Sequence, residues 1–211
     1  MVEFHIVNLR DFGKGSYRQI DDAPFGGGSG MVLMAEPLFK AIDHAMDLVS
    51  GPDNVRVIYP SPQGRIWNQD IAEETSQQEK LIVICGHYKG IDERVMEKYV
   101  THEYSLGDFV MTGGEIPAMV MLDSTVRLIP GTLNNLDSAL TDSFSQDLLD
   151  HPHYTHPREI DGMEVPEVLL GGYHAKIEAW RQEQKEKRTQ EKKPDLWKKF
   201  EKLKESEINH E

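Results

Sequence analysis

Residues 105–115 of the chain, S-L-G-D-F-V-M-T-G-G-E, combine three glycines, a short apolar run and two carboxylates within eleven residues. Glycine is costly in regular structure unless the backbone must pass close to another group. A loop that presents main chain can hydrogen-bond a small planar ligand through its N–H and C=O groups. Further along, Asp142 stands between the hydroxyl residues Thr141 and Ser143. A ligand loop followed by an isolated acid predicts an enzyme.

The elements that must position this loop alternate between strands and helices. We expect strands over residues 4–9, 55–59, 81–85 and 109–111, and helices over residues 36–50, 71–78, 92–100 and 115–128. Such alternation predicts an α/β domain with a parallel sheet, and ligands of such sheets bind at the carboxyl ends of the strands. The loops P-S-P-Q-G, G-H-Y-K-G and T-G-G-E each follow a strand, so we expect them to converge on one pocket.

The last third of the chain has a different pattern. Residues 145–172 are rich in His, Pro and Asp with little periodicity, which predicts a long connection. Residues 173–204 have the pattern of helices, and residues 176–204 hold 11 Lys/Arg against 6 Asp/Glu in a chain of net charge −13. A basic end on an acidic body favours binding of a polyanion at one place only. A solvated helix pair with ordinary Lys/Glu faces remains open as the alternative.

Composition narrows the class of protein. The chain has no apolar run long enough to span a bilayer and no secretory signal at its start, so we expect no membrane association. The single cysteine, Cys85, has the pattern of a small buried hydrophobe, and a reducing cytoplasm fits best. His151, His153 and His156 lack acid or cysteine partners at clean ligand spacing, so we expect no metal there.

Seven segments, in order along nearly the whole chain, form a more specific pattern. They are D-D-A-P-F-G-G-G-S-G-M (21–31), Y-P-S-P-Q-G-R (59–65), C-G-H-Y-K-G-I-D-E-R (85–94), Y-S-L-G-D-F-V-M-T-G-G-E-I-P-A-M (104–119), D-S-F (142–144), D-H-P-H-Y-T-H-P (150–157) and V-P-E-V-L-L-G-G-Y-H (165–174). Together they resemble the bacterial tRNA (guanine-N1)-methyltransferases of the TrmD family, which belong to the trefoil-knotted SPOUT class.

The resemblance implies a fold, an activity and partners. The fold is α/β, with a parallel sheet, a deep trefoil knot and a small all-helical C-terminal domain. Residues 1–144 would form the knotted donor-binding domain, residues 145–172 an interdomain linker, and residues 173–211 the basic, helical tRNA-binding domain. The implied enzyme is a homodimer with active sites between its subunits. It transfers a methyl group from S-adenosylmethionine to N1 of the guanine 3′ to the anticodon in tRNA.

The resemblance also implies roles for individual residues. The implied donor contacts are Gly86, Leu106, Gly107, Asp108, Phe109, Val110 and Met111, completed by Tyr59, Pro60, Ser61, Pro62, Gly113 and Gly114. Asp142 matches the family's general base, and Arg127 matches its catalytic arginine. Residues 21–28 match a loop associated with the target guanine.

The chemistry of guanine suits the types of the two catalytic residues. Guanine N1 carries a proton and is a poor nucleophile until a base such as Asp142 takes that proton. Charge then develops on O6, where a guanidinium such as that of Arg127 stabilises it. By residue type alone, Asp142 remains open to a capping or turn role, Arg127 to a structural ion pair, and Asp108 to a turn.

The chain departs from the family at two places. Relatives usually begin with a further strand-and-helix unit ahead of the equivalent of Val2, so we expect exposed apolar sheet edge here. Lys89 stands where many relatives carry a glutamate linked to Mg²⁺ dependence. Because a lysine cannot ligate Mg²⁺, we expect any Mg²⁺ dependence to be weaker or differently organised. Two alternatives stay open: another knotted RNA methyltransferase, or an RNA-binding dimer without turnover.

Overall fold

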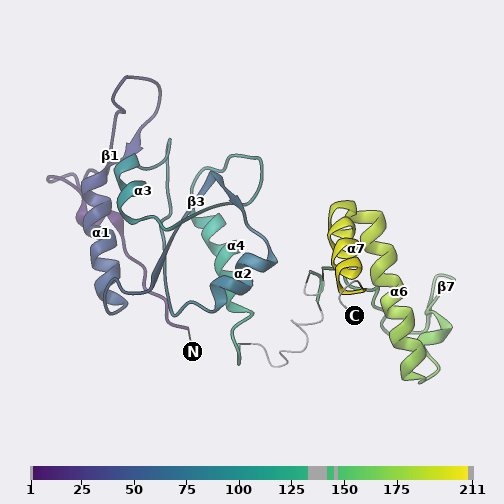
Figure 1. Cartoon of the computed structure of the whole chain (residues 1–211). Helices are drawn as coiled ribbons and strands as arrows, with labels where there is room; N and C mark the ends of the chain where they lie inside the picture. The colour runs from purple at the N-terminus through teal and green to yellow at the C-terminus, as the bar shows by residue number, and fades with distance from the viewer. Residues whose placement is uncertain (1, 133–141, 145–146, 209–211) are drawn as a thin grey trace. The chain divides into compact units, whose positions relative to one another are not determined.

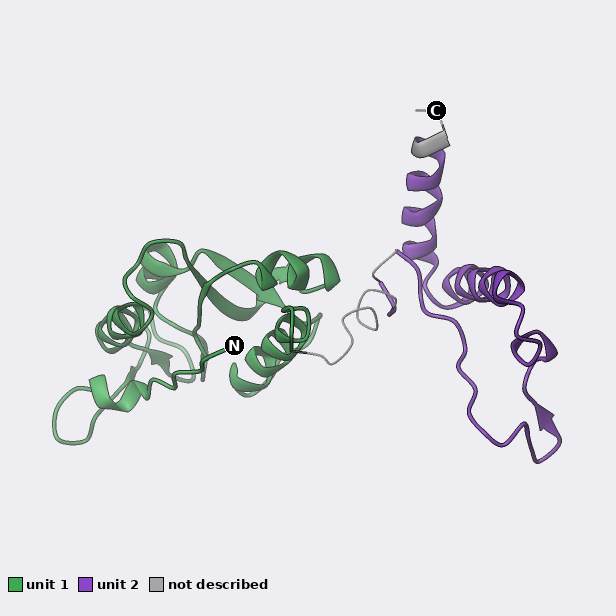
Figure 2. Ribbon diagram, turned by 90° about the horizontal axis from the view of Figure 1, so that it is seen from below, with its two compact units in different colours: residues 1–134 green, residues 135–211 purple. Residues whose placement is uncertain are grey.

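The computed structural model describes residues 2–132, 142–144 and 147–208 (Figure 1). The chain divides into two compact units, residues 1–134 (unit 1) and residues 135–211 (unit 2), and each is described by itself (Figure 2). Within the described residues, no helix has both the length and the apolar character needed to cross a membrane.

Unit 1 is built on a parallel three-stranded sheet, which confirms the predicted α/β class. The sheet has the order β4-β3-β5, and β3 runs parallel to both neighbours. Its strands are β3 (Val55–Ile66), β4 (Lys80–Val83) and β5 (His102–Ser105). Its helices are α1 (Ala35–Leu48), α2 (Gln69–Ser76), α3 (Glu93–Tyr99) and α4 (Glu115–Val126).

Helices cover both faces of this sheet (Figure 1), because alternate residues of β3 point to opposite sides. Val57 and Tyr59 belong to a buried cluster with residues of α1 and α3. Ile58, between them, belongs to a second cluster that contains Ile71 of α2 and Met121 of α4. The central strand is therefore apolar on both faces, as a covered parallel strand must be.

A short hairpin precedes α1 and carries the first glycine-rich loop. Strand β1 (Asp21–Asp22) pairs antiparallel with β2 (Val32–Leu33), and the loop 25–30 connects them. Three consecutive glycines, Gly26 to Gly28, have φ values of +85°, +80° and +115°, which favour glycine over other residues. Leu33 anchors the hairpin, because it is buried and its N–H donates to the carbonyl of Gly90 at 3.0 Å.

Two predicted strands of unit 1 are wrong. Residues 4–8 form no strand; a 3-10 helix, η1 (Leu9–Phe12), follows them, and the side chain of Ile6 is 97% exposed. Residues 109–111 are not a strand either, because the N–H of Phe109 donates locally to Gly107 O at 2.9 Å. The strand of this region is β5, which ends at Ser105 where the loop begins. Apolar runs alone do not distinguish a strand from an exposed apolar loop.

In the described part of unit 2, α6 (His174–Lys192) and α7 (Pro194–Ile208) are two helices joined by a single residue, Lys193. Residues 159–169 precede them and form β6 (Glu159–Ile160), β7 (Met163–Glu164) and the 3-10 helix η2 (Glu167–Leu169). The β6–β7 hairpin lies within the predicted linker, where the sequence showed little periodicity. Its turn residues Asp161 and Gly162 have φ values of +52° and +76°, so the D-G dipeptide was the missed signal.

Candidate active site

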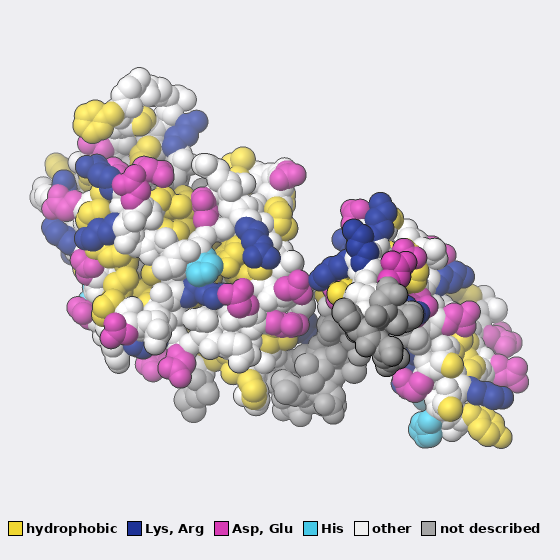
Figure 3. Space-filling model, viewed as in Figure 1, with side chains coloured by type: hydrophobic (Ala, Val, Ile, Leu, Met, Phe, Trp, Pro, Cys, Tyr) yellow, Lys and Arg dark blue, Asp and Glu magenta, His cyan; other side chains and the backbone are white. Residues whose placement is uncertain are grey.

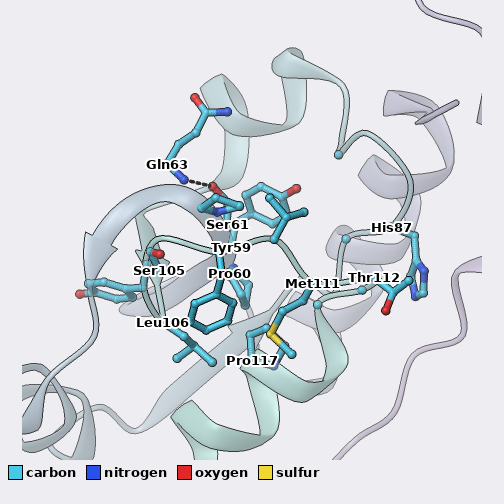
Figure 4. Close-up of a pocket in the computed structure, with 18 of the residues that line it drawn as sticks. Tyr59, Pro60, Ser61, Gln63, His87, Ser105, Leu106, Met111, Thr112 and Pro117 are labelled. Carbon is cyan, nitrogen blue, oxygen red and sulfur yellow. Dashed lines mark hydrogen bonds between the residues drawn. The ribbon is translucent and has the colours of Figure 1, made fainter. Parts of the chain in front are cut away.

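A pocket of about 310 Å³ lies at the carboxyl ends of the three parallel strands of unit 1 (Figure 4). Its wall comes from three segments and the first turn of α4: residues 59–63, residues 86–90, residues 104–114 except 108, and Pro117. The three segments predicted to converge therefore do line one pocket, but residues 60–64 lie within β3, where its pairing with β5 shifts register between Pro60 and Arg65, and do not form a loop that follows the strand. Ligands of open parallel sheets bind at this end of the strands.

Glycine is required where α4 begins against the end of β4. A Cβ on Gly114 would lie 2.7 Å from the backbone nitrogen of Gly86 and 2.8 Å from Cα of Cys85. The N–H of Gly114 instead donates to Gly86 O at 2.8 Å. On the pocket side, a Cβ on Gly86 would lie 2.8 Å from the Tyr59 ring. Gly114 thus brings the start of α4 into main-chain contact with the segment after β4, and Gly86 lets the Tyr59 ring pack against the same backbone.

The segment after β5 forms the apolar side of the pocket, where Leu106 and Met111 lie near Pro117 (Figure 4). The hydroxyl of Ser105 holds the turn, since it donates to Gly107 O at 3.0 Å and accepts from the Gly107 N–H at 3.1 Å. Phe109 and Val110 remain 55% and 84% exposed although they lie at the pocket. The pocket therefore combines apolar surface with main-chain polar groups, as sites for small ligands do.

Two polar pairs brace the pocket. Ser61 donates its hydroxyl hydrogen to Glu103 Oε1 at 2.5 Å and accepts the N–H of Gln63 at 3.0 Å (Figure 4). His87 Nε2 lies 2.6 Å from Glu115 Oε1, which joins the β4 loop to the start of α4. The hydrogen bond from His87 lowers the pKa of Glu115, so this carboxyl group is ionised at neutral pH. Both pairs link loops that are distant in sequence.

Burial controls the ionisation of two groups near the pocket. Burial, assisted by the charge of Glu103, raises the pKa of the Tyr59 hydroxyl. Burial, assisted by the charge of Glu115, raises the pKa of the Cys85 thiol to about 11. The thiol is therefore protonated at neutral pH and is a poor nucleophile. This agrees with the interpretation of Cys85 as a packing residue.

The structure brings together all but one of the residues that the sequence assigned to donor binding. Asp108 is the exception: it is exposed and is not part of the pocket wall. Residues that the sequence analysis did not assign also form the wall: Gln63, His87, Tyr88, Lys89, Gly90, Tyr104, Ser105, Thr112 and Pro117. The signal for most of them was available, because they belong to the loops that follow the strands.

The glycine-rich loop of the β1–β2 hairpin returns beside this pocket. A Cβ on Gly30 would lie 3.0 Å from Cγ of Lys89, which lines the pocket. The N–H of Lys89 donates to Met31 O at 3.0 Å. Residues 30 and 31, just beyond the loop matched to the target guanine, are therefore in contact with the pocket wall.

The two predicted catalytic residues lie in different units. Arg127 caps the C-terminus of α4 in unit 1 and is exposed. Asp142 belongs to unit 2, is exposed, and its Oδ1 accepts the N–H of Ser143 at 3.0 Å. That contact is a local one of the kind that the turn alternative requires. The catalytic roles of both residues therefore stay predictions.

Fold and pocket define an α/β protein that binds a small ligand in a backbone-rich cleft at the ends of parallel strands. Comparison with known proteins specifies the family. The model of the family described as "tRNA (Guanine-1)-methyltransferase TrmD" matches residues 1–199. The chain belongs to this family, which confirms the resemblance seen in its motifs.

Individual relatives agree with the family match. A protein of Brevibacillus brevis is 51% identical over 200 residues, which cover 95% of this chain and 81% of the relative. One of Staphylococcus carnosus is 52% identical over 200 residues, 95% of this chain and 80% of the relative. One of Clostridioides difficile is 47% identical over 199 residues, 94% and 86% of the two chains. All three are named tRNA (guanine-N(1)-)-methyltransferase.

Proposed function

We propose that this protein transfers a methyl group from S-adenosylmethionine to N1 of the guanine 3′ to the anticodon in tRNA. The observation that carries the proposal is the pocket, whose wall contains twelve of the thirteen residues predicted to bind the donor. Membership of the family over residues 1–199 supports the same reaction. Since the substrate is tRNA, the proposal places the enzyme in the cytoplasm.

The pocket suits the methyl donor in its composition. Glycine main chain at Gly86, Gly113 and Gly114 lets a planar base approach the wall closely, although the Gly114 N–H and the Gly86 carbonyl already pair with each other, and Leu106 and Met111 offer apolar surface. Tyr59 to Pro62 close the opposite side. When bound, S-adenosylmethionine supplies a methyl group already activated by its sulfonium charge. The task of the pocket is then to hold and align.

Proton transfer is assigned to two side chains outside the pocket wall. In this proposal, Asp142 accepts the N1 proton of guanine, and Arg127 stabilises the negative charge that develops on O6. Both side chains are exposed, so both are accessible to a bound nucleotide. The hairpin loop 21–28 would contact the guanine, because the residues that follow it touch Lys89 of the pocket wall.

The proposal includes a homodimer. Helix α4 exposes Ile116 by 60%, Met119 by 67% and Val120 by 44%. Their spacing places them on one face of the helix, next to the pocket residue Pro117. An exposed apolar face of this kind marks a protein interface, and a second copy of the chain would cover it. We expect sedimentation equilibrium to give twice the chain mass, and Met119→Lys to give the monomer mass.

The proposal also includes a trefoil knot in unit 1. The support is that the loop 105–115 returns to the end of β4, where Gly114 and Gly86 are hydrogen-bonded. The chain beyond β5 thus contacts a segment 28 residues earlier, since residue 114 is hydrogen-bonded to residue 86. Slow refolding after complete denaturation, compared with an unknotted domain of the same size, would support the knot.

Mg²⁺ dependence is expected to differ from that of relatives with a glutamate at position 89. Lys89 lies in the pocket wall and offers an ammonium group, which cannot ligate a cation. We therefore expect methyl transfer to persist, at least in part, when a chelator removes Mg²⁺. A steep Mg²⁺ requirement retained in Lys89→Ala would contradict this expectation.

The decisive experiment is methyl incorporation from labelled S-adenosylmethionine into unmodified tRNA transcripts. One transcript carries guanine 3′ to the anticodon, and its matched control carries adenine at that nucleotide. We expect incorporation only into the first transcript, at N1 of that guanine. Incorporation at another nucleotide would show a related RNA methyltransferase. Binding of donor and tRNA without incorporation would show an RNA-binding dimer.

A further inference from the structure

Asp150, His151 and His153 form a compact cluster in unit 2, in the stretch that follows Leu149. One ligand atom from each residue lies within 4.8 Å of the other two. His153 Nε2 is 2.7 Å from Asp150 Oδ2, and His151 Nε2 is 3.7 Å from Asp150 Oδ1. The two imidazole rings lie 4.4 Å apart, centroid to centroid. The spacing of these histidines in the sequence indicated no acid partner, whereas in the structure both of them contact Asp150.

Hydrogen bonds with backbone groups orient two members of the cluster. His151 Nδ1 lies 3.1 Å from the carbonyl oxygen of Pro152. In the tautomer that carries its hydrogen on Nδ1, this hydrogen bond forms and the lone pair of Nε2 stays available to a metal ion. Oδ1 of Asp150 accepts the His151 N–H at 2.7 Å. A ring N–H bound to a backbone carbonyl is the usual support of a histidine that ligates a metal.

Helix α6 holds the same stretch in place. The N–H of Leu149 donates to Thr189 Oγ1 at 2.8 Å, and Thr189 is fully buried. Arg188 donates to the main-chain oxygen of Asp150 at 3.4 Å, so its charge binds the backbone rather than the carboxylate. Burial works to raise the pKa of Asp150, but the hydrogen bonds from His153 and from the His151 backbone lower it overall. The carboxylate is therefore charged and anchored.

We propose that Asp150, His151 and His153 bind a divalent transition-metal ion of the Zn²⁺ class. Two imidazole nitrogens and one carboxylate oxygen are borderline ligands that prefer Zn²⁺, Co²⁺ or Ni²⁺ to the hard ion Mg²⁺. Neighbouring ligands of a tetrahedral zinc lie about 3.4 Å apart, as follows from bond lengths near 2.0–2.1 Å. The 2.7 Å separation is to Oδ2 of Asp150 and the 3.7 Å separation is to Oδ1, and one ligand atom from each residue lies within 4.8 Å of the others, so side-chain rotation must bring one carboxylate oxygen and both ring nitrogens around a common ion.

The cluster has an open side. The side chain of His153 is 69% exposed, whereas those of Asp150 and His151 are 20% and 13% exposed. Three protein ligands with an open fourth position are typical of reactive or regulatory zinc sites rather than of structural ones.

The test is a titration of the full-length chain, without affinity tag and stripped of metal, with Co²⁺. Visible absorption reports the ligand field, and competition with Zn²⁺ gives the affinity. The variants are Asp150→Asn and His153→Ala, and the matched control is His156→Ala, another exposed histidine of the same segment. Circular dichroism checks that each variant keeps its helices. Neither tRNA nor methyl donor is present, so the result does not depend on the proposed function.

We expect the native chain and His156→Ala to bind one Co²⁺ per chain with equal affinity. Asp150→Asn and His153→Ala should each lose at least about tenfold in affinity, and Zn²⁺ but not excess Mg²⁺ should displace the cobalt. Equal binding by the native chain and His153→Ala would overturn the proposal. Displacement by Mg²⁺, or a spectrum identical to that of hydrated Co²⁺, would overturn it as well.

Discussion

Units 1 and 2 differ in how they are held together. Seventeen of the eighteen buried hydrophobic residues among those described lie in unit 1, and unit 2 contributes only Leu148. In α6, the only buried residue is Thr189, a polar one. Space-filling side chains show basic and acidic groups interspersed over unit 2 (Figure 3). Unit 1 is therefore stabilised by a core, and unit 2 by helix pairing and surface charge.

This difference suits the two units to different steps, namely binding of a small ligand in unit 1 and binding of a large polyanion in unit 2. A ligand pocket made of main chain must be rigid, because hydrogen-bond geometry tolerates little displacement, and unit 1 supplies that rigidity from two covered sheet faces. A charged, thinly packed unit is suited to a large polyanion, whose binding depends on many exposed cations.

Removal of the proposed base should have the largest effect. Asp142→Ala is expected to reduce methyl transfer by about 10²–10⁴-fold, because N1 of guanine then keeps its proton. The affinity for S-adenosylmethionine, measured by calorimetry, should not change, since Asp142 is not among the residues that line the pocket.

The matched control for Asp142 is Glu164→Ala, an exposed acid of unit 2, which should keep full activity. A parallel loss of donor affinity in Asp142→Ala would mean that the division between binding and proton transfer is wrong. Full activity of that variant would contradict the role of Asp142 as the base and favour the turn role shown by its contact to Ser143.

The rigidity of unit 1 is tested at Gly114. Gly114→Ala places a Cβ within 2.8 Å of main-chain atoms of Cys85 and Gly86, which follow β4. Backbone atoms cannot move aside as the end of a flexible side chain can. We expect a loss of about 1–3 kcal/mol in the free energy of unfolding, as for other overpacked sites, and weaker donor binding. Gly171→Ala in unit 2 meets only Tyr173 at 3.5 Å, an ordinary contact, and should be nearly neutral. Equal losses of stability in Gly114→Ala and Gly171→Ala, measured by thermal denaturation, would contradict the proposed difference in rigidity between the two units.

The role of the basic helices is tested by charge removal. Lys187, Lys192 and Lys193 are exposed on or next to α6, and their replacement by glutamine should weaken tRNA binding several-fold. The slope of log affinity against log salt should fall by up to about three, since each lost phosphate contact contributes about 0.7–0.9. Lys40→Gln in unit 1, which removes a partner of Glu36, is the control. An unchanged salt dependence of the triple variant would rule out these helices as the tRNA-binding surface.

The smallest effect concerns the His87–Glu115 pair. The folded-state pKa of Glu115 is lowered, chiefly by the hydrogen bond from His87, so its contribution is present above the ordinary carboxyl pKa and lost as pH falls below it. Both side chains are about half exposed, which limits the contribution to about 0.5 kcal/mol. Glu115→Gln should therefore lower stability at pH 7 and not at pH 3 in urea titrations. A larger loss at pH 3 would reverse the sign of this argument.

Sequence reasoning succeeded where local pattern and global fold agree. The helices α1 to α4 and the strand β4 were predicted within two residues, because their apolar runs are bounded by clear breakers such as Gly51. The start of β3 was also predicted, but the strand continues to Ile66, through Pro60, which was expected to end it. It failed at residues 4–9 and 109–111, where apolar residues remain exposed instead of pairing in the sheet. Burial distinguishes these cases, and burial is a property of the whole chain.

The candidate site shows the same limit. The loop 105–115 was found from its glycines, but the need for glycine at position 114 arises from Cys85 and Gly86, which are distant in sequence. The His87–Glu115 and Ser61–Glu103 pairs also join segments that no periodicity connects. Asp150 was overlooked as a partner of His151 and His153, because adjacency in sequence does not show which side chains face each other.

Seven ordered motifs in the sequence were enough to indicate the family. The alternation of strands and helices was enough to predict an α/β sheet with ligand-binding segments at its carboxyl edge. Tertiary structure decided which residues of those loops form the pocket, where a glycine is sterically required, and which titratable groups share a hydrogen bond. The two kinds of information differ because they depend on atoms at different separations along the chain. Motif and periodicity are local properties of the chain, whereas close approach, burial and ionisation depend on atoms brought together from distant positions.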